Sequence, residues 1–150
     1  MIFACREQPK KEMKFNRLIP ELVVKDFDKS LDFYVNQLGF VIDFERKEDK
    51  FAQISYQGSQ IMLNQDNGDW ITAEPVFPRG RGINFQIETD NLDDIEQKIS
   101  LYHIPYFVKT KEQWYRIDQK EEGVKEFLIQ DLDGYLLRFQ QYLGEREWKK

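Results

Sequence analysis

Apolar and polar residues alternate along several short stretches of the chain, and two longer stretches carry apolar residues at helical spacing. The alternating stretches predict strands at residues 18–24, 40–46, 51–56, 60–64, 83–87, 106–108, 114–117, 125–130 and 135–141. The helical spacing predicts one helix over about residues 27–38 and another over about residues 92–102. The order of strand, helix and further strands therefore occurs twice.

The two halves also resemble each other residue by residue. Gly58 recurs as Gly134, 76 positions later, and the same offset relates further pairs: Phe51 and Phe127, Ile61 and Leu137, Leu63 and Phe139, Gln65 and Gln141. In the helices an offset of 64 relates Leu31 to Ile95, Val35 to Ile99 and Gly39 to His103. Similarity at a fixed spacing is typical of a duplicated unit. The sequence predicts an α+β fold of two tandem βαβββ modules.

A length of 150 residues suits one domain. We assign residues 13–150 to it, with modules at about 15–65 and 82–143. Residues 66–81, rich in glycine, proline and asparagine, form the linker. Residues 1–12 show no periodicity and are interpreted as a flexible tail, and either Met1 or Met13 could be the translation start. The charged stretch 144–150 predicts a short helical turn or a frayed end.

Capping residues mark the ends of both predicted helices. Asp26 or Asp28 can cap the first helix and Asn91 the second, because a short polar side chain accepts a hydrogen bond from a free N–H group of the first turn. Gly39 suits the left-handed residue that ends a helix, and His103 occupies the equivalent position. We therefore interpret His103, the single histidine, as a helix-end residue rather than as a catalytic base.

Composition narrows the class of protein. A net charge of −5 without a basic stripe argues against nucleic-acid binding. The single cysteine, Cys5, fits a reducing compartment, and with no base near it in sequence it is interpreted as a stray thiol. The sequence shows neither a signal peptide nor an apolar run of membrane-spanning length, which predicts a cytoplasmic protein that does not bind a membrane.

Three passages together carry a resemblance to a known family. Residues 24–34 with 38–40 match an opening V-x-D-x-x-x-S-x-x-F-Y … L-G-F pattern, residues 83–87 match the strand that opens the second half, and residues 130–137 match a closing D-P-D-G-N hairpin. Over about residues 17–143 the chain resembles the glyoxalase/bleomycin-resistance/dioxygenase (vicinal oxygen chelate) superfamily, and most closely its bleomycin-resistance branch. The resemblance implies a curved mixed sheet that forms a cleft, with the helices outside.

The resemblance also implies where a metal would bind. Metal-using relatives carry histidine or glutamate ligands on the first and last strands of each module, and the matching positions here hold Ile19, Met62, Gly82 and Arg138. Two of these side chains have no donor atom, and an arginine stays protonated. We therefore expect no metal, no cofactor and no catalytic residues of the glyoxalase or dioxygenase kind.

The strand faces that point away from the helices carry mainly polar side chains. A solvent-exposed face would show the same alternation, and core packing would explain the aromatic residues outside the helical stripes. We favour a ligand cleft, because amides outnumber lysine and glutamate on these faces. The predicted ligand-binding residues are Glu21, Asn64, Trp70, Phe77, Asn84, Gln86, Trp114, Tyr115, Arg138 and Gln140. Among them, Glu21 and Arg138 are expected to form an ion pair at the centre of the cleft.

The function predicted from these residues is sequestration of a small molecule, an aromatic or glycopeptide-like compound, by a metal-free homodimer of the bleomycin-resistance type. Gly123-Val124 stands where some relatives have a Trp-Gly step, which argues against tight binding of bleomycin itself. One alternative is a superfamily enzyme (a lyase, isomerase or thiol transferase) that uses Glu21, the only plausible carboxylate in the cleft, as an acid or base. Another is a structural or regulatory dimer without a small ligand.

Overall fold

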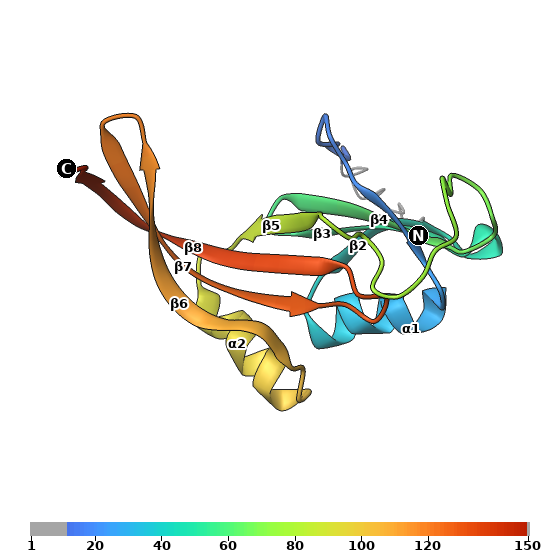
Figure 1. Ribbon diagram of the computed structural model, residues 1–150. Coiled ribbons are helices and arrows are strands. Elements are labelled where there is room, and N and C mark those ends of the chain that lie inside the picture. The colour runs from blue at the N-terminus through green and yellow to red at the C-terminus, as the bar shows by residue number, and fades with distance from the viewer. Residues whose placement is uncertain (1–11, 150) are drawn as a thin grey trace, which may run out of the picture.

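The computed structural model describes residues 12–149, so Cys5 and nearly all of the predicted tail lie outside the described residues. The first module contains β1 (Glu21–Val24), α1 (Phe27–Asp32), η1 (Phe33–Gln37), β2 (Val41–Arg46), η2 (Lys47–Asp49), β3 (Phe51–Tyr56) and β4 (Ser59–Gln65). The second module contains β5 (Asn84–Glu88), α2 (Leu92–Leu101), β6 (Tyr106–Ile117), β7 (Lys120–Gln130) and β8 (Leu136–Glu147). Figure 1 shows both helices below the strands. Neither helix of the described part has the length or the apolar run needed to cross a bilayer.

Each module forms one four-stranded mixed sheet, which confirms the predicted α+β fold of two βαβββ modules. Sheet A has the strand order β1-β4-β3-β2, and sheet B has the order β5-β8-β7-β6. In both sheets the first strand runs parallel to the last, so that Glu21 lies opposite Met62 and Gln86 lies opposite Arg138. The other pairings are antiparallel.

The strand register corrects one part of the predicted repeat. Leu63 and Phe139 are equivalent residues of β4 and β8, but Leu63 lies opposite Ala52 whereas Phe139 lies opposite Phe127. Phe127 therefore corresponds to Ala52 and not to Phe51. The offset between the modules is one residue smaller in the third strand than in the fourth, which the sequence comparison did not resolve.

The two modules share one hydrophobic core. Ile61 and Leu63 of β4 and Leu137 and Phe139 of β8 point into it, as the alternation predicts. The ring of Tyr56 from the first module meets the ring of Phe139 edge to face at 6.0 Å. Ile83, the first residue of the predicted strand 83–87, precedes β5 and is 54% exposed, so it does not belong to this core.

Both helices begin and end as the capping residues indicate. The side chains of Asp26 and Asn91 accept hydrogen bonds at the starts of α1 and α2. Gly39 and His103 have φ angles of 88° and 53°, which confirms the left-handed helix ends. The first helical stretch changes from α1 to the wider η1 at Phe33, so it is not one regular helix.

The last strand of each module also fixes the start of the helix. The Phe27 N–H donates to Gln65 Oε1 at 2.9 Å, and the Leu92 N–H donates to Gln141 Oε1 at 2.9 Å. Since Gln65 and Gln141 are equivalent in the repeat, both modules satisfy a free N–H group of the first helical turn in the same way.

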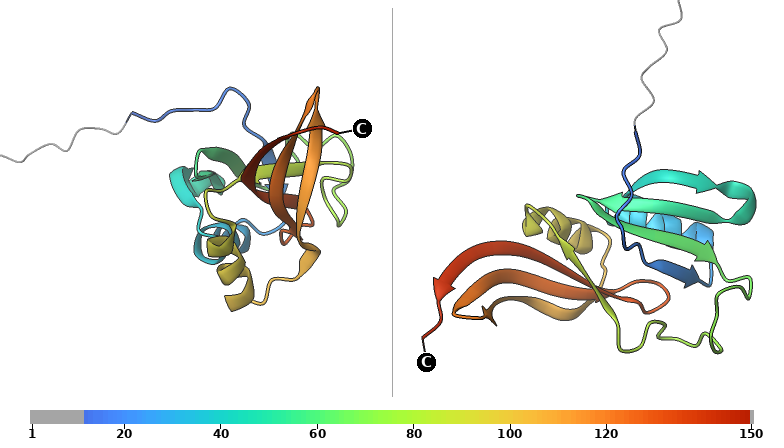
Figure 2. Two further views of the ribbon diagram at one scale, coloured as in Figure 1. Left: turned by 90° about the vertical axis from the view of Figure 1, so that its left-hand side faces the viewer. Right: turned by 90° about the horizontal axis from the view of Figure 1, so that it is seen from above.

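The second module carries an extension that was not predicted. Two separate strands were expected at 106–108 and 114–117, and residues 144–150 were expected to be a helical turn or frayed; instead β6 is continuous and β8 reaches Glu147. Residues 114–123 and 142–147 form a twisted three-stranded arm that extends from the body (Figure 2).

Charged side chains hold the arm together. Lys120 pairs with Glu145 at 2.8 Å, and Arg146 pairs with Glu121 at 2.6 Å. The Arg146 guanidinium also lies over the Trp114 ring, 4.1 Å from its centroid. Cross-strand ion pairs and cation–π contacts of this kind stabilise a sheet with little core beneath it. Because these stretches are rich in charged residues, the sequence pattern did not predict continuous strands here.

Candidate functional site

The open face of each sheet, the face that points away from its helix, carries a hollow. On sheet B the hollow has a volume of about 290 Å³ and brings together four of the predicted ligand-binding residues, Gln86, Tyr115, Arg138 and Gln140. Arg138 and Gln140 stand on β8, and Gln86 comes from the parallel neighbour β5. Tyr115 reaches the hollow from the arm, whose strand β6 continues the open face.

A buried carboxylate lies beneath this hollow. Glu126 of β7 is 2% exposed, and its Oε2 lies 3.9 Å from Arg138 Nε. Tyr115 donates its hydroxyl hydrogen bond to Glu126 Oε1 at 2.7 Å, and Arg138 donates to Gln86. Burial, followed by the hydrogen bond to Glu126, raises the pKa of Tyr115. Glu126 thus contacts two of the side chains that line the hollow, Tyr115 and Arg138.

Two atoms of this group have no hydrogen-bond partner among residues 12–149. They are Glu126 Oε2 and Arg138 Nε, both of which are buried. Buried charged atoms without partners are costly, so the pair relies on mutual attraction at 3.9 Å rather than on a hydrogen bond.

The predicted ion pair between Glu21 and Arg138 is wrong for a single chain. The two residues stand on different sheets, and each has its own partner: Glu21 Oε1 accepts from Asn64 Nδ2 at 3.1 Å, while Arg138 contacts Glu126 and Gln86. The physical reason is the strand order, which places β1 and β8 in separate sheets. Glu21 is also not the only carboxylate near the open faces, because Glu126 lies directly beside Arg138.

Sheet A carries a second hollow of about 650 Å³. Glu21, Met62 and Asn64 line it together with Trp70 from the linker, and Arg46 and Asp49 border it. The indole of Trp70 is 85% exposed, so it stands at the rim and not in the core. This hollow brings together three predicted ligand-binding residues: Glu21, Asn64 and Trp70.

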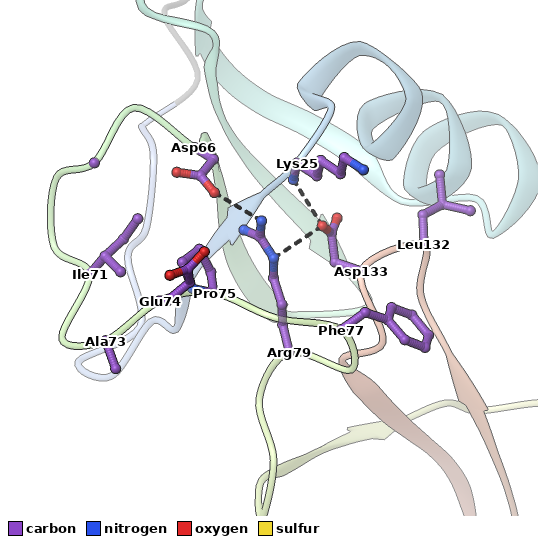
Figure 3. A pocket seen from close by; sticks show the side chains of 11 residues that line it. Lys25, Asp66, Ile71, Ala73, Glu74, Pro75, Phe77, Arg79, Leu132 and Asp133 are labelled. Carbon is purple, nitrogen blue, oxygen red and sulfur yellow. Dashed lines mark hydrogen bonds and ion pairs between the residues drawn. The ribbon is translucent and has the colours of Figure 1, made fainter.

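A third hollow, of about 890 Å³, lies beneath the linker, where Phe77 and Leu132 form part of its wall (Figure 3). Arg79 stands at its centre, but protein groups occupy its nitrogen atoms. Arg79 Nη2 pairs with Asp66 at 2.9 Å, Nη1 donates to the Val23 carbonyl at 2.8 Å, and Nε lies 3.4 Å from Asp133. Arg79 therefore fastens the linker to both modules.

The remaining predicted residues are not gathered in one place. Asn84 is exposed and lines neither open-face hollow. Trp114 packs over Gly123, where a β-carbon would lie 2.6 Å from the ring, so its position requires glycine there. Phe77 belongs to the hollow beneath the linker. Nine of the ten predicted residues are thus divided among three hollows and the arm, and Asn84 belongs to none of them.

The turn between β7 and β8 fixes the strands that carry Glu126 and Arg138. Asp131, 6% exposed, accepts hydrogen bonds from the Tyr34 hydroxyl at 2.8 Å and from the N–H groups of Asp133 at 3.0 Å and Tyr135 at 2.8 Å. Burial raises the pKa of Asp131 to about 6, although these hydrogen bonds oppose the shift. Burial and the nearby Asp131 charge raise the pKa of Tyr34 well above its usual value.

Comparison with known proteins agrees with the fold. A family model described as "Glyoxalase superfamily protein" matches residues 4–94, more than half of the chain. The protein belongs to the glyoxalase superfamily. A comparison with curated protein sequences gives no match.

Solved structures share the fold at low sequence identity. A glyoxalase/bleomycin resistance protein/dioxygenase from Alicyclobacillus acidocaldarius is 20% identical, with a TM-score of 0.61, over 86% of this chain and 92% of that one. One from Nocardioides is 15% identical, with a TM-score of 0.62, over 94% and 93%. TioX from Micromonospora sp. ML1 is 16% identical, with a TM-score of 0.66, over 86% and 100%.

The residues present do not fit the metal that the superfamily implies. Two of the expected ligand positions, Ile19 and Gly82, precede β1 and β5, and the register instead places Glu21 beside Met62 and Gln86 beside Arg138. One carboxylate, a thioether, an amide and a guanidinium are a poor set of donors for a divalent ion. Within residues 12–149, no three His, Cys, Asp or Glu side chains group together as a metal site.

Sequence reasoning missed Glu126, although a signal was present. Phe127 and Ile129 alternate as core residues of β7, which places Val124, Glu126 and Leu128 on the opposite face. A glutamate between two apolar residues on one face of a strand indicates a charge that needs a partner. The partner could not be identified without the register that places Glu126 next to β8.

Proposed function

We propose that the protein binds a small organic molecule on its open sheet faces and acts by sequestering it, as a metal-free protein of the bleomycin-resistance type. The observation that carries the proposal is the group formed by Arg138, Glu126 and Tyr115. It places a guanidinium and a phenol ring at the surface of a hollow, held from below by a buried carboxylate. A site that combines aromatic surface with a few fixed polar groups is typical of ligand binding.

The charges of this group suggest the chemistry of the ligand. Glu126 offsets the charge of Arg138, so the outer edge of the guanidinium offers N–H donors with little net positive charge. A neutral acceptor, such as an amide carbonyl, suits these donors better than a multiply charged anion does. Tyr115 and Ile117 extend the wall along the arm and suit a planar or apolar body. An aromatic compound that carries amide groups fits both features.

Arg138→Lys should weaken ligand binding about tenfold or more, because a lysine keeps the charge beside Glu126 but loses the planar fork of donors. We would screen bleomycin and a panel of aromatic amides by thermal shift, since binding to the folded state raises the melting temperature. Isothermal titration with each hit would then measure affinity.

Gln97→Ala on α2, away from both open faces, is the control, and it should leave binding to sheet B unchanged. Equal affinity of the Arg138→Lys variant and the wild-type protein would contradict the site. A panel without any binder would contradict the proposed function.

We also propose that the protein is a homodimer. The proposal is supported by the two separate half-clefts, because a second copy could place the open face of sheet A opposite the open face of sheet B and enclose a ligand between them. Sedimentation velocity at tens of micromolar should therefore show a species of twice the chain mass. A single monomeric species at that concentration would contradict the dimer.

A further inference from the structure

Residues 12–17 cross the open face of sheet A before the chain enters β1. Figure 2 (right) shows this segment, in blue, passing over the strands of the first module. The Asn16 N–H donates to Gln60 Oε1 at 2.7 Å, Gln60 Nε2 donates to the Lys14 carbonyl at 2.7 Å, and Asn16 Nδ2 donates to the Gly58 carbonyl at 2.8 Å. Gln60 therefore uses both ends of its amide to hold the main chain of the segment.

Two hollows adjoin on the open face that this segment crosses. On one side lies the hollow of Glu21, Met62 and Trp70. On the other lies a hollow of about 440 Å³ that Met13 and Lys14 form with Ile42 and Gln53. Gln53 and Met62 are direct neighbours across β3 and β4, so the two hollows meet at one cross-strand pair.

The attachment of the segment is weak. Its hydrogen bonds are exposed to solvent, and Met13 and Phe15 remain 52% and 54% exposed. Phe15 touches Phe44 only through one edge-to-face contact, with 6.2 Å between the ring centroids. A segment with few buried contacts and exposed hydrogen bonds opens at a much lower free energy than the core.

The second module cannot hold a similar segment in this way. Leu136 of β8 stands at the position of Gln60, because Arg138 and Met62 are equivalent in the strand register. A leucine offers neither a donor nor an acceptor to a crossing main chain. The two open faces are related by the repeat, but only sheet A has an amide at this position, that of Gln60, which can hold a segment across its face.

We infer that residues 12–17 form a displaceable strap over the open face of sheet A. When the strap is in place, this face is divided into two small hollows. When it is released, Phe44, Phe51, Gln53 and Met62 border one continuous cleft, wide enough for a larger apolar or aromatic molecule. The strap therefore controls which size of molecule this face accepts, and the inference does not depend on the proposed site around Arg138.

The strap is tested with Gln60→Ala in the full-length chain, since this change removes the amide that holds Lys14 and Asn16. The matched control is Gln97→Ala, which removes an amide side chain from the exposed face of α2. Nile red is a suitable probe because it is neutral, whereas the acidic side chains near Glu21 would repel a sulfonated dye. Gln60→Ala should raise Nile red fluorescence about twofold or more at an unchanged melting temperature.

Amide hydrogen exchange supplies the second measurement. In the wild-type protein, residues 12–17 should exchange about tenfold or more faster than β4, and Gln60→Ala should accelerate the exchange of Asn16 further without affecting β4. The inference is overturned if residues 12–17 exchange as slowly as β4, since the segment would then be a fixed part of the sheet. It is also overturned if Gln60→Ala and Gln97→Ala bind Nile red equally.

Discussion

Replacing Asp131 with alanine should lower the free energy of unfolding by about 3–5 kcal/mol at pH 5. The substitution removes the acceptor of the Tyr34 hydroxyl and of the N–H groups of Asp133 and Tyr135. Tyr34 is fully buried, so water cannot replace the lost acceptor without opening the core between the modules. Each buried donor that is left without a partner costs about 1–3 kcal/mol.

Urea denaturation at pH 5, followed by far-UV circular dichroism, measures this loss. Asp131→Asn is the matched control, because the amide oxygen can still accept from the two N–H groups and the side chain keeps its shape. The asparagine variant should lie within about 1.5 kcal/mol of the wild-type protein. If alanine and asparagine destabilise equally, the hydrogen bonds at Asp131 are not what holds the turn.

The second large effect is a loss of stability as the pH rises from 4 to 7. Burial raises the pKa of Asp131 from its usual 3.8 to about 6, so the folded protein binds the proton more tightly than the unfolded chain does. The stability that this carboxyl contributes is fully present below pH 3.8 and is lost as the pH rises through 6. The loss between pH 4 and pH 7 amounts to about 2–3 kcal/mol.

The measurement compares the wild-type protein with Asp131→Asn in urea at a series of pH values. Other carboxyl groups titrate in the same range in both proteins, so their contributions cancel in the difference. That difference should shift steadily in favour of the asparagine variant as the pH rises. A difference that is constant between pH 4 and pH 7 would show that Asp131 titrates normally in the folded state.

Local chemistry made much of the fold predictable from the sequence. The caps at Asp26 and Asn91 and the left-handed residues Gly39 and His103 depend on their immediate neighbours, and the structure shows them as expected. The alternation in β4 and β8 identified the core side chains because the period of a strand is fixed. The order of the elements followed from the same periodicities.

Features that depend on strand pairing could not be predicted in this way. The arm consists of strands whose charges, such as Lys120 and Glu145, are satisfied only by residues far along the chain. The partner of Arg138 required knowledge of which strand lies beside β8, and the expected partner Glu21 belongs to the other sheet. The contact between Tyr34 and Asp131 joins residues 97 positions apart.

That last contact has a consequence for how the chain folds. The helical stretch that contains Tyr34 is complete early in synthesis, but its hydroxyl has no acceptor until Asp131 has been made. In the same way, the N–H groups of Phe27 and Leu92 lack their acceptors until Gln65 and Gln141, in the last strand of each module, have been made. Contacts between distant residues slow folding, because the intervening chain must lose its freedom first. We therefore expect the two modules to fold together after synthesis, with a nascent first module that gains its final packing only from the second.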